Sequence, residues 1–213
     1  MTGTQNTGHI EATQLDAGSS IDPRAFRSAL GAFATGVTII TACGPDSALV
    51  GVTCNSFNSV SLDPALVLWS LDCRALSRGI FEQATHFTVN VLAEDQLELS
   101  NRFASKGVLN KFEGTAWSPG LGGAPILSGC AAHFECRVYA CYDGGDHRIL
   151  IGQVERFEQS ARSGLLYHKG GYAVSGPHPV LAPKRREKRD STVRRAGRPA
   201  QAKSAIEVRT CAR

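Results

Sequence analysis

The stretch GVTCNSFNSVSLDPALVLWSL, residues 51–71, is the most informative part of this chain. It sets small hydroxyl and amide side chains between two apolar runs and turns at Leu62-Asp63-Pro64 into the run at residues 65–69. Short polar groups at strand ends and in a tight connection indicate a floor for a ligand as well as part of a core. The polar side chains of this floor are Thr53, Asn55, Ser56, Ser59 and Ser61.

The size and composition limit the class of protein. The chain has 213 residues, of which 42% are hydrophobic and 20% charged, so it suits one globular core and is too short for two ordinary domains with a linker. No window approaches about 18 consecutive apolar residues, so we expect no transmembrane helix and no membrane partner. Residues 1–21 lack the basic start and apolar run of a secretory signal and are predicted to be a flexible leader.

Cysteine and charge usage point to a cytoplasmic protein that does not bind nucleic acid. The seven cysteines form no CxxC pair and no Cys/His ligand spacing, so we predict reduced thiols and no metal site. The formal charge of +4 is unevenly spread, because residues 180–213 carry eleven basic and three acidic residues, which leaves the body acidic. The segment RRAGRP, residues 194–199, partly matches the Gly-Arg-Pro core of minor-groove hooks. A solvated, disordered basic tail over 177–213 is the simpler interpretation.

The hydrophobic pattern between these ends, residues 22–176, predicts one mainly β domain. Asp22-Pro23 is typical of a helix start, and Phe26, Leu30 and Phe33 follow at helical spacing, so we expect that face to be buried and the helix to stop at Thr35-Gly36. In the next helix we expect Leu76, Ile80 and Phe81 to point inward. Predicted helices cover 23–33, 74–84 and 94–103; predicted strands cover 37–41, 49–54, 65–71, 87–92, 130–142, 147–158 and 167–174.

Many antiparallel strands with few helices favour a small β-barrel with flanking helices. No strand–helix–strand alternation with a glycine-rich first turn occurs, so the pattern does not favour a doubly wound nucleotide fold. The turn Asp143-Gly144-Gly145-Asp146 joins the two longest strands as a hairpin.

Six motifs in order make the chain resemble a known family. They are FRSALGAFATGVTIIT (26–41), TCNSFNSVSLDP (53–64), FTVNVL (87–92), LSNRFASK (99–106), GDH (145–147) and YHKGGY (167–172). Together they are similar to the short flavin reductases with an FMN-binding split-barrel fold, the reductase components of two-component flavin-dependent monooxygenases.

The resemblance implies a fold and an activity. The fold would be a six-stranded antiparallel barrel of Greek-key type in a homodimer. The protein would reduce FMN or FAD with NADH or NADPH, and the reduced flavin would diffuse to a separate monooxygenase. Hydride transfer from nicotinamide to flavin requires two rings held about 3–3.5 Å apart in line, so the protein's task is placement and electrostatics.

The resemblance also assigns site residues. The motif residues implied to hold flavin are Gly36, Val37, Thr38, Thr53, Asn55, Ser56, Phe57, Ser59, Val60, Ser61, Leu62, Phe103, Ala104, Ser105, Tyr167 and Tyr172. His147 is the candidate catalytic residue, placed beside the nicotinamide, although it could also be a hairpin histidine without a ligand. Tyr167, Gly171 and Tyr172 could form a nicotinamide-side wall or be ordinary core residues. Lys106 or Lys111 could add a cation at the phosphate end.

Other residues favour structural roles. We interpret Asn90 as a structural hydrogen-bonding residue, Trp69 and Trp117 as packing residues and Cys54 as a small neutral filler. The segment Asp72-Cys73-Arg74 departs from the small polar residues of many family members, which puts a flavin contact there in doubt, although Arg74 could itself bind an anion.

Two alternative functions stay open from the sequence. The first is a split-barrel protein that binds flavin without reducing it. The second is an oxidase of the pyridoxamine-phosphate-oxidase type, which would need a basic substrate pocket.

Overall fold

The computed structural model describes residues 21–106, 108, 110–178 and 180. The predicted leader over 1–21 and basic tail over 177–213 therefore fall almost wholly outside the described residues, and both stay predictions. Within the part that is described, none of the helices has the length and apolar character needed to cross a bilayer.

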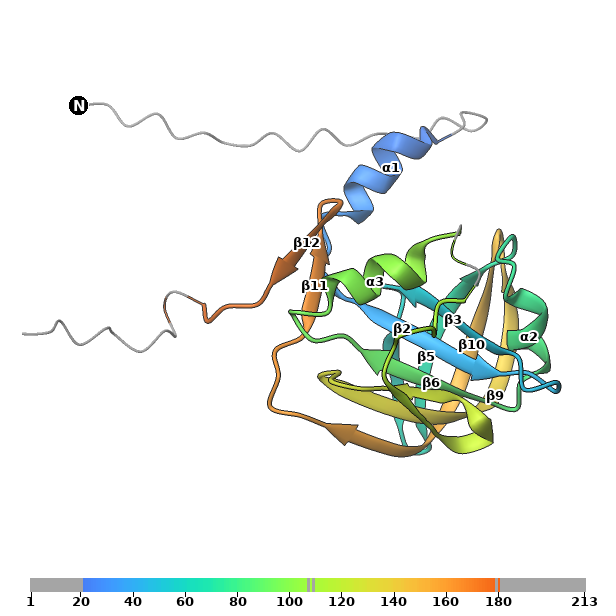
Figure 1. The fold of residues 1–213 in the computed structure, drawn as a ribbon. Helices are drawn as coiled ribbons and strands as arrows, with labels where there is room; N and C mark the ends of the chain where they lie inside the picture. The colour runs from blue at the N-terminus through green and yellow to red at the C-terminus, as the bar shows by residue number, and fades with distance from the viewer. Residues whose placement is uncertain (1–20, 107, 109, 179, 181–213) are drawn as a thin grey trace, which may run out of the picture. The chain divides into compact units, whose positions relative to one another are not determined.

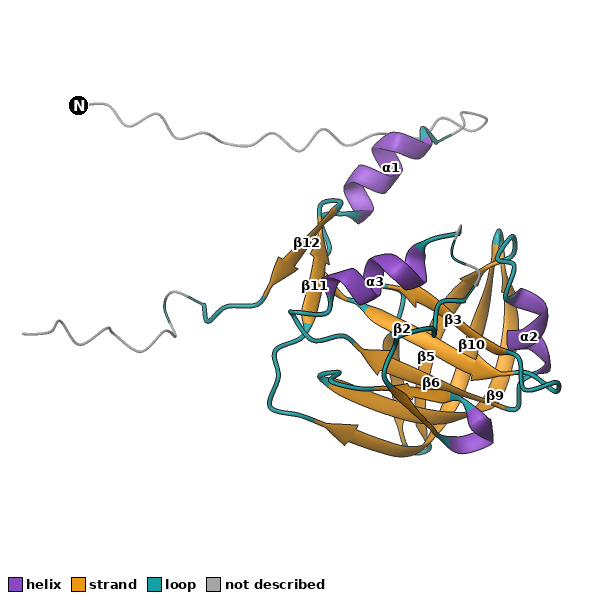
Figure 2. Cartoon of the chain, in the orientation of Figure 1, coloured by secondary structure: helices purple, strands orange, loops and turns teal. Residues whose placement is uncertain are grey.

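One antiparallel sheet dominates the fold (Figures 1 and 2). Its strand order is β3-β2-β6-β9-β10-β5-β4. The strands are β2 (Thr38–Cys43), β3 (Leu49–Cys54), β4 (Asn58–Leu62), β5 (Ala65–Asp72), β6 (His86–Val91), β9 (Ala132–Gly144) and β10 (His147–Gln159). The predicted fold class, mainly β with flanking helices, is confirmed. The sheet has seven strands rather than six because residues 58–62 pair with β5 as a strand of their own, and β3 and β4 form its two edges.

Shorter elements surround this sheet. β1 (Thr35–Gly36), β11 (Leu165–His168) and β12 (Gly171–Val174) form a three-stranded sheet, and β7 (Trp117–Pro119) pairs with β8 (Pro125–Leu127). The 3-10 helix η1 (Leu121–Gly123) lies between β7 and β8 in the chain, so part of the predicted loop over 105–125 is ordered. The α-helices are α1 (Pro23–Leu30), α2 (Arg78–Gln83) and α3 (Leu97–Ala104).

Aromatic side chains and a buried amide stabilise the centre of the sheet. The Trp69 ring is fully buried and meets Phe81 and Phe87 edge-on at centroid distances of 5.0 and 5.9 Å. The side-chain amide of Asn90 donates to the Ile39 carbonyl at 3.1 Å and accepts from the Leu127 amide at 2.8 Å. The packing role of Trp69 and the structural role of Asn90 are thus confirmed, whereas Trp117 is 36% exposed, meets Phe112 edge-on and pairs with the buried Leu127.

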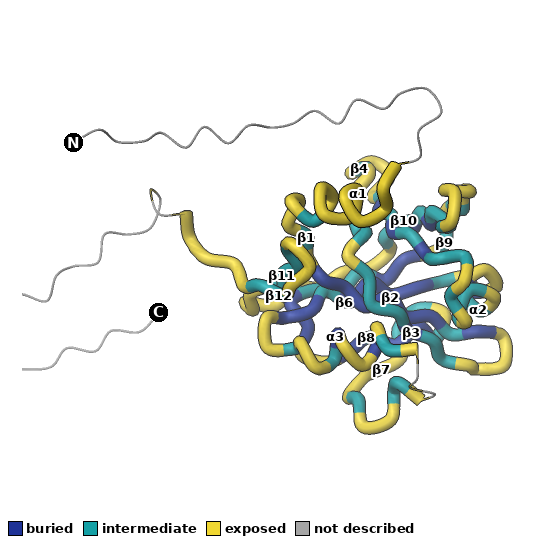
Figure 3. Tube along the Cα trace, turned by 90° about the horizontal axis from the view of Figure 1, so that it is seen from above, coloured by how far each residue is buried: buried dark blue, intermediate teal, exposed yellow. Residues whose placement is uncertain are grey.

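The first helix differs from its prediction. Asp22 caps α1 as expected, accepting from the Arg24 and Ala25 amides, but the helix ends at Leu30 rather than at Thr35-Gly36, which form β1 instead. All residues of α1 are at least partly exposed, and its apolar side chains Phe26 and Leu30 are 51% and 58% exposed (Figure 3). The predicted burial of this face is wrong for a single chain because no other element of the described chain covers it.

The second helix is also shorter than expected. It begins at Arg78, so Leu76 lies in the preceding turn and is 93% exposed rather than pointing inward. Phe81 is buried as predicted, and Ile80 is half-buried.

Candidate functional site

A groove lies where β3, the loop before α2 and the end of α3 meet. Its volume is about 360 Å³, and it is lined by residues 49–52 of β3, residues 72 and 74–77 with Ile80, and residues 103–106, 108 and 110–112. Small-molecule sites in proteins commonly enclose about 300–1,000 Å³, so the groove has the size of a ligand site.

The close packing of α3 on β3 depends on Gly51. A β-carbon at this position would lie 2.4 Å from Cε1 of Phe103, so only glycine lets the Phe103 ring pack against the strand. Phe103 in turn meets Phe112 edge-on at 5.1 Å. The Lys111 ammonium donates to the Phe103 carbonyl at 2.6 Å and more distantly to that of Gly51. These contacts hold one wall of the groove in place.

The charges that line the groove favour an anion. Three cations, on Arg74, Lys106 and Lys111, line it together with a single carboxylate, that of Asp72. Arg74 donates to Asp72 at 2.9 Å, and this hydrogen bond holds the pKa of Asp72 well below its usual range. Burial lowers the pKa of Lys111. Apolar walls together with lining cations fit an aromatic ring system that carries a phosphate-bearing chain.

Three predicted flavin residues line this groove directly. They are Phe103, Ala104 and Ser105, at the end of α3. The loop 72–77, whose contact with a ligand the sequence had put in doubt, also lines the groove through Asp72 and Arg74.

A second set of predicted residues meets α3 from the other side. The Thr53 hydroxyl donates to the Ser100 carbonyl at 2.7 Å, and the Tyr172 hydroxyl lies 2.9 Å from both the Ser100 hydroxyl and the Asn101 carboxamide oxygen. Tyr167 packs edge-on against Tyr172 with ring centroids 5.4 Å apart. These contacts give the two tyrosines a structural role in the hairpin β11–β12, whatever else they touch.

The remaining members of the two flavin motifs lie outside the groove. Val37 and Thr38 are buried, and the Thr38 hydroxyl donates to the Cys54 carbonyl at 3.0 Å, so of this wall only Gly36 is exposed. The Ser56 hydroxyl accepts from the Ser70 amide at 2.9 Å and ties the β3–β4 connection to β5.

The β3–β4 segment is otherwise open to solvent. Asn55, Ser59, Val60 and Leu62 are exposed, and Ser61 is half-buried. Phe57 packs on Phe134 at 5.7 Å. Some of the short hydroxyl and amide side chains in this segment therefore form hydrogen bonds within the fold, and the others are exposed to solvent.

His147 lies beside the groove through strand pairing. His147 is the first residue of β10 and is paired with Asp72 on β5. Beside this pair, the Cys73 amide donates to the Asp146 carbonyl at 3.0 Å. The Nδ1 atom of His147 lies 2.7 Å from the Asp146 carboxylate, which lowers the pKa of Asp146. The imidazole side chain is 41% exposed and so is accessible to a ligand.

Sequence reasoning missed part of the groove. The apolar residues at its centre, Val50, Val52 and Ile80, belong to a strand and a helix that periodicity predicted, but nothing in that pattern indicates which apolar face a ligand shares. Asn110 and Val108 come from an irregular segment without a motif.

Fold and site together define a mainly β protein with a ligand-sized groove that is lined by apolar side chains and by three cations. The family model of the flavin reductase like domain matches residues 30–176. The chain therefore belongs to the flavin reductase-like family, which confirms the resemblance seen in its motifs.

Several named proteins are similar to this chain. The reductase component of a flavin-dependent trigonelline monooxygenase from Acinetobacter baylyi is 42% identical over 75% of this chain and 51% of its own length. The FMN reductase (NADH) SmoA from Agrobacterium fabrum is 44% identical over 70% of this chain and 84% of its own. This chain thus spans about half the length of the first relative but most of the second.

Solved structures agree with this assignment. The NADH:FAD oxidoreductase SgcE6 of Streptomyces globisporus, in complex with NAD and FAD fragments, superposes with a TM-score of 0.70 at 35% identity, covering 76% of this chain and 99% of that one. These relatives have the fold and the enzyme class that the sequence predicted for this chain. Their names also include the flavin and nicotinamide cofactors that it predicted.

Proposed function

We propose that this protein is an NAD(P)H:flavin oxidoreductase that reduces FMN, or FAD, and supplies the reduced flavin to a separate monooxygenase by diffusion. The observation that carries the proposal is the match of residues 30–176 to the flavin reductase like domain, which also contains the groove lined by Arg74, Lys106 and Lys111. The relatives named as reductase components support a separate oxygenase partner.

The residues have distinct roles in this proposal. Flavin, when bound, supplies the hydride-accepting ring. Phe103, Ala104 and Ser105 form its binding wall, and Arg74 with Lys106 neutralises the phosphate. The exposed Arg74 exchanges its half-buried partner Asp72 for the phosphate oxygens as the ligand enters.

The other predicted residues act around the ring. We assign Thr53, Asn55, Ser56, Phe57 and the segment 59–62 to the ring and ribityl side, together with the backbone at residues 36–38. His147 orients the nicotinamide by hydrogen bonding, with Tyr167 and Tyr172 beside it. Backbone amides at the strand ends stabilise the negative charge that develops on the flavin.

The test is reduction of free flavin by the purified full chain. With NADH and catalytic amounts of protein, added FMN should bleach under anaerobic conditions, and NADH should be consumed in proportion. Parallel assays with NADPH in place of NADH, and with FAD in place of FMN, show which nicotinamide and which flavin the protein prefers. If flavin binds but neither nicotinamide bleaches it, the protein is a flavin-binding module and the reductase proposal is wrong.

We also propose a homodimer located in the cytoplasm. The exposed apolar face of α1, formed by Phe26 and Leu30 and continued by Phe33, supports self-association, since such faces on soluble proteins mark interaction sites. The six cysteines in the described part of the chain are free thiols, which supports a reducing compartment.

A further inference from the structure

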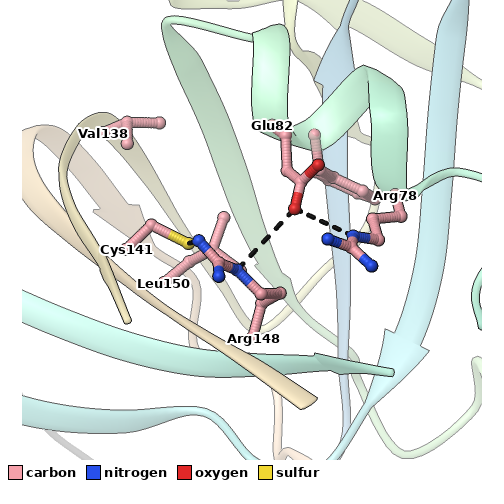
Figure 4. A pocket seen from close by; sticks show the side chains of 7 residues that line it. Arg78, Glu82, Val138, Cys141, Arg148 and Leu150 are labelled. Atoms are coloured by element: carbon pink, nitrogen blue, oxygen red, sulfur yellow. Dashed lines mark hydrogen bonds and ion pairs between the residues drawn. The ribbon is translucent and has the colours of Figure 1, made fainter. Parts of the chain in front are cut away.

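A second, smaller pocket lies on the other side of α2 and has no part in the proposed flavin chemistry. Its volume is about 290 Å³, and the side chains used below, Arg78, Glu82, Cys141 and Arg148, all line it. Figure 4 shows the thiol of Cys141 beside the Arg148 guanidinium, with Glu82 between the two arginines. The pocket lies between α2 and the hairpin formed by β9 and β10, so its members come from two distant parts of the sequence.

The environment of Cys141 differs from that of the buried thiols. Arg148 donates from one terminal nitrogen to the Cys141 sulfur at 3.2 Å and from the other to the Asp143 carboxylate. Cys141 is only half-buried, whereas burial raises the pKa of Cys130 and of Cys136 to about 12. Partial exposure beside a guanidinium is the setting of reactive cysteines, because the positive charge stabilises the thiolate.

The Arg148 guanidinium also carries an unused hydrogen-bond donor. Its Nε atom is buried and has no hydrogen-bond acceptor among the described residues. The Glu82 carboxylate is 3.7 Å away, which is ion-pair but not hydrogen-bond distance, and Glu82 is engaged at 2.9 Å by Arg78. A buried donor without a partner costs free energy, so an oxygen atom entering beside the thiol would gain a hydrogen bond.

We propose that Cys141 is a peroxide-reactive thiol, and that this pocket binds hydrogen peroxide and stabilises the sulfenic acid that forms. In the reaction the thiolate sulfur attacks one peroxide oxygen. The S–O bond forms as the O–O bond breaks, sulfur loses two electrons, and the leaving hydroxide takes a proton from solvent to become water. Arg148 holds the thiolate and donates to the departing oxygen.

The proposed reductase would itself expose this site to peroxide. Free reduced flavin is oxidised by dioxygen with formation of hydrogen peroxide, and this link rests on the proposed function. The thiol chemistry does not, because peroxide can be added to the protein without flavin or nicotinamide. A failed reductase assay and a failed peroxide reaction are therefore separate results.

The test is site-resolved trapping of sulfenic acid. The full chain, free of flavin, is treated with hydrogen peroxide and dimedone, and the adduct at each cysteine is quantified by peptide mass spectrometry over time. We expect Cys141 to be labelled roughly tenfold faster than Cys43, a half-buried thiol that donates to the Gly44 carbonyl. Equal rates at these two cysteines would overturn the proposal without any mutation.

Two variants test the role of the pocket's charges. Arg148→Leu should slow labelling of Cys141 roughly tenfold and leave Cys43 unchanged, because the thiolate loses its counter-charge. Glu82→Gln removes one of the two carboxylates that pair with Arg148, the other being that of Asp143, and should speed labelling of Cys141. Circular dichroism verifies that each variant is folded, and labelling of Cys141 that is the same in wild type and Glu82→Gln would count against the assignment even if Arg148→Leu failed to fold.

Discussion

At the scale of single residues, Gly51 determines whether the groove can form. The Phe103 ring occupies the space that a side chain at residue 51 would fill. The nearest ring atom lies 2.4 Å from the position that a β-carbon would take. No flavin motif includes Gly51, yet it sits at the point where β3 and α3 come closest. The groove therefore depends on a residue that contributes no functional group to it.

Gly51→Ala should weaken both the fold and flavin binding. The added methyl group must displace Phe103, which we expect to cost about 1–3 kcal/mol of unfolding free energy. Gly79→Ala is the matched control, because a β-carbon there meets nothing within 4 Å and alanine favours the helix by about 0.5–1 kcal/mol. Urea denaturation and FMN fluorescence titration measure the two effects, and equal FMN affinity in both variants would contradict the role of Phe103.

His147 offers a second prediction at this scale. His147→Ala should raise the KM for NADH about threefold to tenfold, the value of a lost hydrogen bond, with a smaller change in flavin affinity. His86→Ala is the control, since His86 pairs with Glu155 at 3.6 Å on another part of the sheet. If flavin affinity falls and the KM for NADH holds, His147 belongs to the flavin side of the site.

At the scale of elements, α3 connects the parts of the proposed site. Its Ser100 carbonyl accepts a hydrogen bond from the Thr53 hydroxyl of β3. The Ser100 hydroxyl and the Asn101 carboxamide oxygen are hydrogen-bonded to the Tyr172 hydroxyl of β12. The last turn of α3 then forms the groove wall. A short amphipathic helix thus fixes the distance between two flavin motifs that are more than 100 residues apart in the chain.

Tyr172→Phe tests this connection. Removing the hydroxyl leaves Ser100 and Asn101 without their partner, so we expect a loss of about 1–2 kcal/mol in unfolding free energy. Tyr139→Phe, at a tyrosine that is 53% exposed on β9, should stay within about 0.5 kcal/mol of wild type. Thermal or urea melts of the two variants give the comparison, and matching stabilities would show that the hydroxyl contacts contribute nothing.

At the scale of the whole molecule, the apolar face of α1 is the largest departure from a self-sufficient fold. Helical spacing predicted a buried face, and the single chain leaves it exposed. The proposed homodimer would resolve this difference, because an isologous interface buries the same face on both protomers.

The dimer prediction is direct. The wild-type protein should be dimeric in light scattering, and Phe26→Ser with Leu30→Ser should weaken the dimer by at least about tenfold, since burying each side chain is worth about 1.5–3 kcal/mol. Arg24→Ser, on the opposite face of α1, should remain dimeric. A monomeric wild-type protein at micromolar concentration would remove the proposed second copy.

Local patterns were enough for much of this molecule. Alternation and β-branched residues predicted the strands that became β2, β5, β6, β9 and β10, and the Asp-Pro pair located the start of α1. Predictions failed where burial depends on distant partners: Leu76 reads as an inward helical residue but precedes the helix, and it lies at the mouth of the groove instead. The residue types at 72–74 put a flavin contact in doubt, although Arg74 could bind an anion. In the structure both Asp72 and Arg74 line the groove.

The sequence by itself determined the family, the mainly β class and the segments that carry chemistry, because motif residues and strand periodicity are local properties of the chain. Only the tertiary structure decided which of those segments share a cavity, since strand pairing brings His147 opposite Asp72 and the absent side chain of Gly51 admits Phe103. It also placed Glu82 of α2 beside Arg148 of β10, two residues that no motif connects. Proximity across a folded sheet follows from register and packing, and neither is written in any single stretch of residues.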